Sequence, residues 1–367
     1  MKIGVNGIYL SSNATGIANV IINFVNELSK NHEIIIFTCF PLSNDCRERL
    51  NSNITIITKP NPIRANSIIW FFTLFPFLLN KNKCDWVYSP AVWTPFFISK
   101  KIKKLVQVND FVSIDYKNTM RFWNRIISSL IEKHSLKNAD IIWTISEYTK
   151  NKMFEYYPFT KTKTIFTGLS CDPYFTRKSF SEDTILTLKK RLGITKPFLF
   201  FVGSKEPRKN ISFLLKVFKT FHKTNNFQLV LSGISGWGKT GIDEILEEKD
   251  FPNGDIIFTG FITEEELCCL YHVADCFIST SFNEGFGLPQ LEAMKCGCPV
   301  ITSHNSAMIE VVENAGITVD GWDIQSWCNK LQTVLNNKNS IIERQYKKAD
   351  NFAWNNIIIG LEKLLAK

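Results

Sequence analysis

The sequence predicts an α/β protein built from two doubly wound, Rossmann-like domains. Its 367 residues are enough for two or three domains that each bury a core. Short apolar strands alternate with amphipathic helices along the whole chain, which is the pattern of βαβ units in a parallel sheet. The alternation restarts after Asp172, where a polar segment leads to another apolar strand and a glycine-containing loop.

Residues 1–172 form the first predicted domain. Its first strand, Lys2–Ile8, precedes a helix whose apolar residues recur at helical spacing from Ile17 to Leu28. The other strands are short apolar runs separated by helical stretches. They are expected at Glu33–Cys39, Ile54–Thr58, Trp86–Ser89, Leu105–Val108, Ile141–Ile145 and Thr164–Phe166.

Residues 173–350 form the second predicted domain, and residues 351–367 are expected to form a helix that crosses back to the first. The second domain repeats the alternation of apolar strands and helices. Its strands are expected at Phe198–Val202, Gln228–Leu231, Ile256–Phe258, Cys276–Thr280 and Val300–Thr302.

The net charge of +9 is confined to the first domain. Residues 1–172 contain 21 lysines and arginines against 12 acidic residues, whereas residues 173–367 contain 22 of each kind. A basic domain permits nucleic acid, an anionic membrane or a phosphorylated molecule as its partner. The aromatic residues lie in apolar runs and are not interleaved with basic ones, so no nucleic-acid partner is expected.

The chain is expected to be cytoplasmic. Its start lacks the apolar stretch of a secretory signal, and ten scattered cysteines without a CxxC pair favour reduced thiols in the core. The longest apolar run, Ile68–Leu79, is shorter than the ~20 residues of a spanning helix. A buried helix is the favoured interpretation of this run. The alternative is an apolar rim in the membrane interface, helped by Lys81, Lys83, Lys100, Lys101, Lys103 and Lys104.

A glycine-rich turn between a strand and a helix carries the strongest signal for a ligand site. It reads SFNEGFGLPQLEAM. Gly285 and Gly287 let the backbone approach a ligand closely, and Pro289 suits the first helical position, where the positive helix end favours a diphosphate. Glu292, expected in the first turn of that helix, is suited to a ribose or another vicinal diol, and Glu284 to a further part of the ligand.

This segment resembles the retaining, metal-independent glycosyltransferases of family GT4, which have the two-domain GT-B fold. The mark of that family is two glutamates separated by seven residues around a GFG-L-P turn, and Glu284 and Glu292 fit it. The resemblance implies two domains that face each other across a cleft. It extends to FFVGSKEPRKN (Phe200–Asn210), ADIIWTISE (Ala139–Glu147), TGL (Thr167–Leu169) and FAW (Phe352–Trp354).

The resemblance also implies a role for each residue of the site. Lys209, with Arg208, would neutralise the donor's pyrophosphate as the glycosidic bond breaks, because fixed cations stabilise such a leaving group. Glu284 would contact hydroxyls of the transferred sugar, and Glu292 would contact the ribose. Further donor-binding positions would be Gly203 and the backbone of Gly285, Phe286, Gly287 and Leu288.

Two positions depart from the family pattern. Where the family usually has His-Asp after a strand of the first domain, this chain has Asn109 and Asp110. An amide can hydrogen-bond a sugar hydroxyl but cannot act as a general base, so Asp110 is the nearer base candidate, with a structural carboxylate as an equal alternative. Where the family favours G-x-G, Gly16 is followed by Ala18, whose methyl group hinders close approach of a donor phosphate or an acceptor.

A second motif points to another class of protein. GISGWGKT (Gly233–Thr240) fits the phosphate-loop pattern of ATP-binding proteins. Its place on the second strand of the second domain argues against that function. A binding protein that kept the fold without activity is a further alternative, against which Glu284, Glu292 and Lys209 argue. No DxD pair or HExxH spacing is present, so no metal is expected.

The sequence therefore predicts a retaining, metal-independent hexosyltransferase. GDP-mannose is the first donor expected, by similarity to O-antigen-type mannosyltransferases, and a UDP-hexose is the alternative. For bacterial members, the resemblance implies a glycan or polyprenyl-diphosphate-linked acceptor in surface-polysaccharide synthesis. The first, basic domain would receive this acceptor at the inner face of the plasma membrane, in peripheral contact with anionic lipid.

Overall fold

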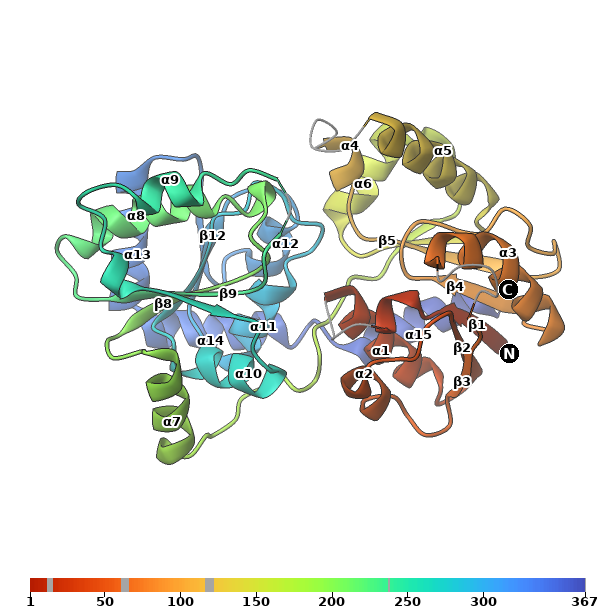
Figure 1. Cartoon of the computed structure of the whole chain (residues 1–367), viewed down its shortest axis with the longest axis horizontal. Coiled ribbons are helices and arrows are strands. Elements are labelled where there is room, and N and C mark those ends of the chain that lie inside the picture. Colours follow the sequence, from red (N-terminus) through yellow and green to blue (C-terminus); the bar gives the residue numbers. More distant parts are fainter. Residues whose placement is uncertain (12–15, 61–65, 116–121, 237, 367) are drawn as a thin grey trace. The chain divides into compact units, whose positions relative to one another are not determined.

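The chain folds into two compact units in a computed structural model (Figure 1). Unit 1 comprises Met1–Ser170 and Ala353–Lys367, and unit 2 comprises Cys171–Phe352. Each unit contains one parallel sheet with its own helices, which is the predicted fold class. The structure describes residues 1–11, 16–60, 66–115, 122–236 and 238–366.

Unit 1 is built on a seven-stranded parallel sheet in the order β3-β2-β1-β4-β5-β6-β7. The chain starts in the middle of the sheet, builds outward to one edge and returns to the other side of β1, so the switch point lies between β1 and β4. The strands are β1 (Lys2–Asn6), β2 (Glu33–Thr38), β3 (Thr55–Thr58), β4 (Trp86–Ser89), β5 (Lys103–Val108), β6 (Ile141–Thr144) and β7 (Thr164–Phe166).

Helices cover both faces of this sheet. On one face, α3 (Ser67–Lys81) packs Trp70 and Phe75 into a cluster with β2, and α5 (Phe122–Asn138) and α6 (Glu147–Tyr156) pack against β5 and β6. On the other face, α1 (Gly16–Leu28) places Phe24 4.5 Å from Tyr88 of β4, measured between ring centroids. The last helix, α15 (Trp354–Leu365), packs beside α1. Two short helices, α2 (Asn44–Glu48) and α4 (Val112–Asp115), complete the unit.

Unit 2 repeats this topology with six parallel strands in the order β10-β9-β8-β11-β12-β13. Its switch point lies between β8 and β11, which pair directly. The last strand, β13, was not predicted, because only three residues of the chain pair there. The strands are β8 (Phe198–Val202), β9 (Gln228–Ser232), β10 (Ile256–Gly260), β11 (Cys276–Ser279), β12 (Val300–Ser303) and β13 (Ile317–Val319).

Helices also cover both faces of the second sheet (Figure 1). On one face, α8 (Ile211–His222), α9 (Ile242–Leu246) and α13 (Ile324–Asn336) share a buried cluster with alternate residues of the strands. On the other, Tyr271 packs its ring on Phe200 and Phe277. The helices of that face are α10 (Glu264–Val273), α11 (Leu288–Cys296) and α14 (Lys338–Ala349), and the unit also contains α7 (Glu182–Leu192) and α12 (Met308–Val312).

The apolar run at residues 68–79 forms the helix α3, but only one side of it is buried. Trp70 and Phe75 are inaccessible to solvent, whereas Ile68 and Phe77 are more than half exposed. The favoured expectation of a buried helix is therefore right for one side and wrong for the other. None of the helices in the described ranges is long and apolar enough to cross a membrane. All ten cysteines are buried, as expected for core residues.

Candidate active site

The switch point of unit 2 brings two loops of the sequence together. Strands β8 and β11 are parallel neighbours, so the loops that follow them lie at the same edge of the sheet. The loop after β8 carries Arg208 and Lys209 in a 3₁₀ turn, and the loop after β11 carries Glu284. Doubly wound sheets bind ligands at this kind of edge.

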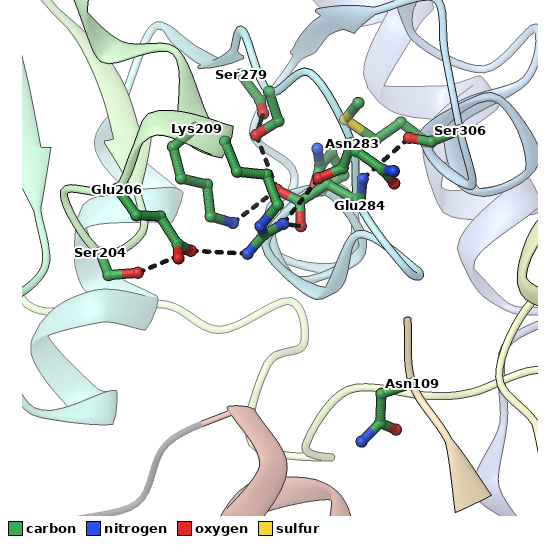
Figure 2. A network of polar contacts seen from close by, with 12 residues as sticks. Asn109, Ser204, Glu206, Lys209, Ser279, Asn283, Glu284 and Ser306 are labelled. Carbon is green, nitrogen blue, oxygen red and sulfur yellow. Dashed lines mark hydrogen bonds and ion pairs between the residues drawn. The ribbon is translucent and has the colours of Figure 1, made fainter. Parts of the chain in front are cut away.

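Glu284 lies at the centre of a polar network that joins these loops (Figure 2). Its Oε1 accepts hydrogen bonds from Lys209 Nζ at 2.6 Å and from Ser281 Oγ at 2.8 Å, and its Oε2 accepts from Arg208 Nη1 at 2.5 Å. The backbone amide of Glu284 donates to Ser306 Oγ at 3.0 Å. Three of the predicted site residues therefore meet at one carboxylate, whose position is fixed from several sides.

The charges around Glu284 keep it ionised. Burial by itself raises the pKa of this carboxyl, but the charges of Lys209 and Arg208 and the hydrogen bonds from Lys209 and Ser281 outweigh burial. Together they lower the pKa to about 2. A carboxylate with so low a pKa is a poor proton acceptor, so Glu284 is suited to accept hydrogen bonds rather than to act as a general base.

Glu206 is a second carboxylate in this network, and it was not among the predicted site residues. Its Oε1 accepts from Arg208 Nη2 at 2.8 Å and from Ser204 Oγ at 3.1 Å. Arg208 is thus held between Glu206 and Glu284. Two carboxylates and two cations make the cluster formally neutral. The available signal was a carboxylate in the same short loop as two basic residues, directly after a buried strand.

Gly203 leaves room for the side chain of Lys209. A Cβ atom at Gly203 would lie 3.2 Å from Lys209 Cε and 3.3 Å from the ring of Phe201, closer than side chains normally pack. The Lys209 stem is therefore buried over the end of β8, with its ammonium group directed at Glu284 (Figure 2). Gly203 acts as a packing residue for Lys209, in addition to any contact with a donor.

The turn after Glu284 leads directly into α11. Gly287 precedes the helix with φ +109°, a conformation that favours glycine. The ring of Phe286 is buried against Phe352, with ring centroids 5.7 Å apart, and anchors the turn. The first N–H groups of a helix have no partner within the helix, so this turn presents backbone donors suited to an anion. Pro289 is the second helical residue and not the first, because α11 begins at Leu288.

Glu292 lies in the second turn of α11, not in the first as predicted, and its Oε2 accepts a hydrogen bond from the Tyr271 hydroxyl at 3.1 Å. Burial raises the pKa of Glu292, the bond from Tyr271 lowers it in part, and carboxylates such as Glu264 raise it again, to about 8. The two glutamates of the motif therefore differ: Glu284 is ionised, and Glu292 is mostly protonated at neutral pH.

The candidate residues of unit 1 lie after strands of its own sheet. Asn109 follows β5, where its side chain donates to the Pro90 carbonyl at 3.0 Å and accepts from Gln107 at 2.5 Å. Asp110 is the next residue and is exposed. Gly16 is the first residue of α1, and Ala18 is buried inside unit 1. The Ala18 methyl group thus fills the core, contrary to the expectation that it faces a phosphate or an acceptor.

The phosphate-loop motif does not adopt the structure that an ATP site needs. In such a site the lysine and serine or threonine begin a helix that follows the loop. Here Lys239 and Thr240 precede Gly241, and the next helix, α9, starts at Ile242 and has five residues. This loop, which follows β9, pairs with the loop after β8 through a β-bridge between Lys205 and Ser235. Trp237 of the motif lies outside the described residues.

Two family models match the chain, one on each half. Residues 14–172 match the model described as Glycosyltransferase Family 4, and residues 185–353 match the model described as glycosyl transferases group 1. The chain belongs to the family 4 glycosyltransferases. It is similar to the O-antigen chain mannosyltransferase B of Escherichia coli, with 29% identity over 280 residues that cover 74% of this chain and 72% of the relative.

Solved structures share the fold of this glycosyltransferase. Sucrose-phosphate synthase from Thermosynechococcus elongatus superimposes with a TM-score of 0.79 and 18% identity, over 99% of this chain and 98% of that one. HepE of Anabaena in complex with UDP-glucose gives a TM-score of 0.78 at 15% identity, over 100% and 99% of the two chains. At such identities the likeness shows the fold alone, and it confirms the predicted GT-B fold.

We expect Glu206→Gln to lower kcat of the glycosyltransferase without raising KM for the donor. The amide keeps the shape of the Glu206 side chain but weakens its hydrogen bond with Arg208, because the bond is no longer between two charged groups. Loss of one charge-assisted hydrogen bond corresponds to about a tenfold loss of rate. The site also loses a negative charge, which does not disfavour an anionic donor. Steady-state kinetics with varied donor measure both constants.

The control for this substitution is Lys205→Met in the same loop, since Lys205 lies over the ring of Phe258 and outside the network of Glu284. In an Arg208→Met background, Glu206→Gln should lower kcat little further, because the guanidinium group that Glu206 contacts is absent. An equal loss in both backgrounds would show that Glu206 does not act through Arg208.

Proposed function

We propose that this protein is a retaining, metal-independent hexosyltransferase that moves mannose from GDP-mannose to a glycan or polyprenyl-diphosphate-linked acceptor in surface-polysaccharide synthesis. The observation that carries the proposal is the convergence of Lys209, Arg208 and Glu284 at the switch point of unit 2. It unites two cations for a diphosphate with one ionised carboxylate for a sugar.

The leaving group of such a reaction is a nucleoside diphosphate, which gains negative charge as the glycosidic bond breaks. Lys209 Nζ uses one of its three protons on Glu284, so the same ammonium group has donors to offer a phosphate oxygen. Arg208 adds a planar guanidinium group that is already oriented by two carboxylates. Cations held in place before the reaction stabilise the developing charge without reorganisation.

The sugar is proposed to lie against Glu284. The three hydrogen bonds to this carboxylate leave room for about one more, which suits a sugar hydroxyl. Its negative charge also favours the positive charge that develops on the sugar ring in the transition state. In unit 1, Asn109 is proposed to hydrogen-bond a hydroxyl group, and exposed Asp110 is the base candidate for the acceptor.

Similarity to an O-antigen chain mannosyltransferase supports GDP-mannose as the first donor. The solved structure of HepE with UDP-glucose supports a UDP-hexose as the alternative. A lipid-linked acceptor would be met at the inner face of the plasma membrane, where the basic unit 1 suits anionic lipid. For the candidates of another class, an ATP-binding protein and an inactive binding protein, the described residues offer no comparable set of contacts.

A donor panel tests this function. The purified protein is incubated with GDP-mannose, UDP-glucose, UDP-galactose or ATP, and both the rise in unfolding temperature and the release of nucleotide are measured. We expect GDP-mannose to give the largest of both, with transfer unchanged by a chelator and an α-linked product by NMR. If the protein used only UDP-hexoses, the proposal of GDP-mannose as donor would be wrong and a UDP-hexose would be the donor. Stabilisation by ATP alone would refute the glycosyltransferase function. Loss of transfer with chelator would refute metal independence.

A further inference from the structure

Unit 1 carries an exposed apolar surface that its own core does not explain. Along α3, the exposed side chains are uncharged up to Lys81 at the end of the helix, and they include Ile68, Ile69 and Phe77. In the loop after β4, Phe97 is 81% exposed, the highest value among the large apolar residues of the described chain. On α5, Ile127 and Leu130 are also exposed.

Ring contacts join these segments into one surface. Phe72 of α3 stacks on Phe96 of the loop with centroids 4.8 Å apart, and Phe96 meets His134 of α5 at 4.7 Å. His134 lies one helical turn from Leu130, on the same side of α5. We name the residues Ile68, Ile69, Phe72, Phe77, Phe96, Phe97, Ile127 and Leu130 the apolar face.

Lysines flank the apolar face. Lys100 and Lys101 are exposed and follow Phe97 closely in the chain, and Lys133 and Lys137 are exposed on α5. Within segments 66–81, 90–104 and 127–138 the described acidic residue is Glu132, which is buried. Asp140, the first carboxylate after α5, accepts a hydrogen bond from the backbone of Lys104 at 2.8 Å. The rim is therefore positively charged.

We propose that the apolar face is a docking surface for an anionic lipid bilayer, with Phe97 inserted at the interface and the lysines on the headgroups. The chemistry of the face selects this partner, since exposed aromatic and aliphatic side chains with a lysine rim suit the boundary of acyl chains and anionic headgroups. This proposal deepens the proposed function, because it locates the surface of unit 1 that contacts the membrane. Only the choice of the plasma membrane rests on the proposed function.

Flotation with vesicles tests the proposal. The full chain is mixed with phosphatidylcholine vesicles that contain either no anionic lipid or about one third phosphatidylglycerol. We expect binding to the anionic vesicles that weakens with added salt. Phe97→Ser should reduce the partition coefficient about tenfold, because one buried aromatic side chain is lost. Lys100→Glu with Lys101→Glu should reduce it by at least about tenfold.

Matched variants control for general effects. Phe159→Ser removes another exposed phenylalanine of unit 1, and Lys190→Glu with Lys249→Glu makes the same charge change on exposed positions of unit 2. Both should bind vesicles like the unmodified protein. Release of nucleotide from the donor in the absence of lipid should be unchanged in Phe97→Ser. Vesicle binding therefore tests the apolar face, and nucleotide release tests the proposed function separately.

Three outcomes would overturn the lipid surface. One is equal binding to neutral and anionic vesicles, and another is binding that Phe97→Ser does not weaken. The third is a dimer in gel filtration without lipid that Phe97→Ser dissociates, because the apolar face would then belong to a second copy of the chain.

Discussion

Lys209→Met is expected to lower kcat by about 10²–10³-fold, with a smaller change in KM for the donor. The contact of Lys209 with a leaving diphosphate strengthens as negative charge develops, so its loss is felt more in the transition state than in the bound donor. Methionine retains much of the apolar stem that packs over Gly203 and removes the charge. Initial rates with varied donor separate the two constants.

Folding must be measured alongside the rates. Lys209 is buried and paired with Glu284, so its removal leaves that carboxylate with Arg208 and Ser281 as its described side-chain donors and costs some stability. The unfolding temperature of Lys209→Met shows whether the loss of rate comes from unfolding of the protein. Lys205→Met is the matched control and should keep near-normal kcat. A folded Lys209→Met protein with normal kcat would show that Lys209 does not stabilise the leaving diphosphate.

Donor affinity should rise with pH up to about pH 9, and Glu292→Gln should remove most of that rise. A ribose diol donates hydrogen bonds, so it prefers the ionised form of Glu292. With a pKa of about 8 in the protein without donor, the carboxyl is mostly protonated at pH 7 and mostly ionised at pH 9. If only the ionised form binds, the dissociation constant falls by up to about tenfold over this range.

Binding of the nucleotide-sugar is the measurement, since its diphosphate has no group that titrates in this range. At pH 9 Glu292→Gln should bind the donor about 10–100-fold more weakly, and at pH 7 the difference should be smaller. Glutamine is close in shape to the protonated side chain, which also accepts from Tyr271, so the variant should fold. Affinity that is flat or falls between pH 7 and pH 9 in the unmodified protein would contradict the assigned contact.

Local patterns were sufficient to select the candidate residues of strand-to-helix loops that the structure brings together. Lys209 and Glu284 stand out because each follows a buried strand in a glycine-containing loop. Glu206 was missed because its value depends on a partner: a loop carboxylate is ordinary until Arg208 is seen between it and Glu284. The phosphate-loop motif was set aside from its place in the strand order, and the five-residue helix after it adds a structural reason.

The chemical states of the two motif glutamates were beyond sequence reasoning. Both have the same side chain and lie eight positions apart, yet the pKa of Glu284 is about 2 and that of Glu292 about 8. Burial acts on both, and only Glu284 meets two cations that outweigh it. Those cations come from a loop 75 positions away in the chain, and the pairing of β8 with β11 brings them there.

Periodicity, composition and loop chemistry determined that this chain has two doubly wound domains, a glycine-rich loop with paired glutamates and a basic first domain. These properties are local, because an amphipathic helix or a glycine turn is specified by neighbouring residues. The tertiary structure decided that Arg208 lies between two carboxylates, that burial raises the pKa of Glu292 and that one side of α3 stays exposed. Burial and charge depend on distance in space, and the fold sets that distance.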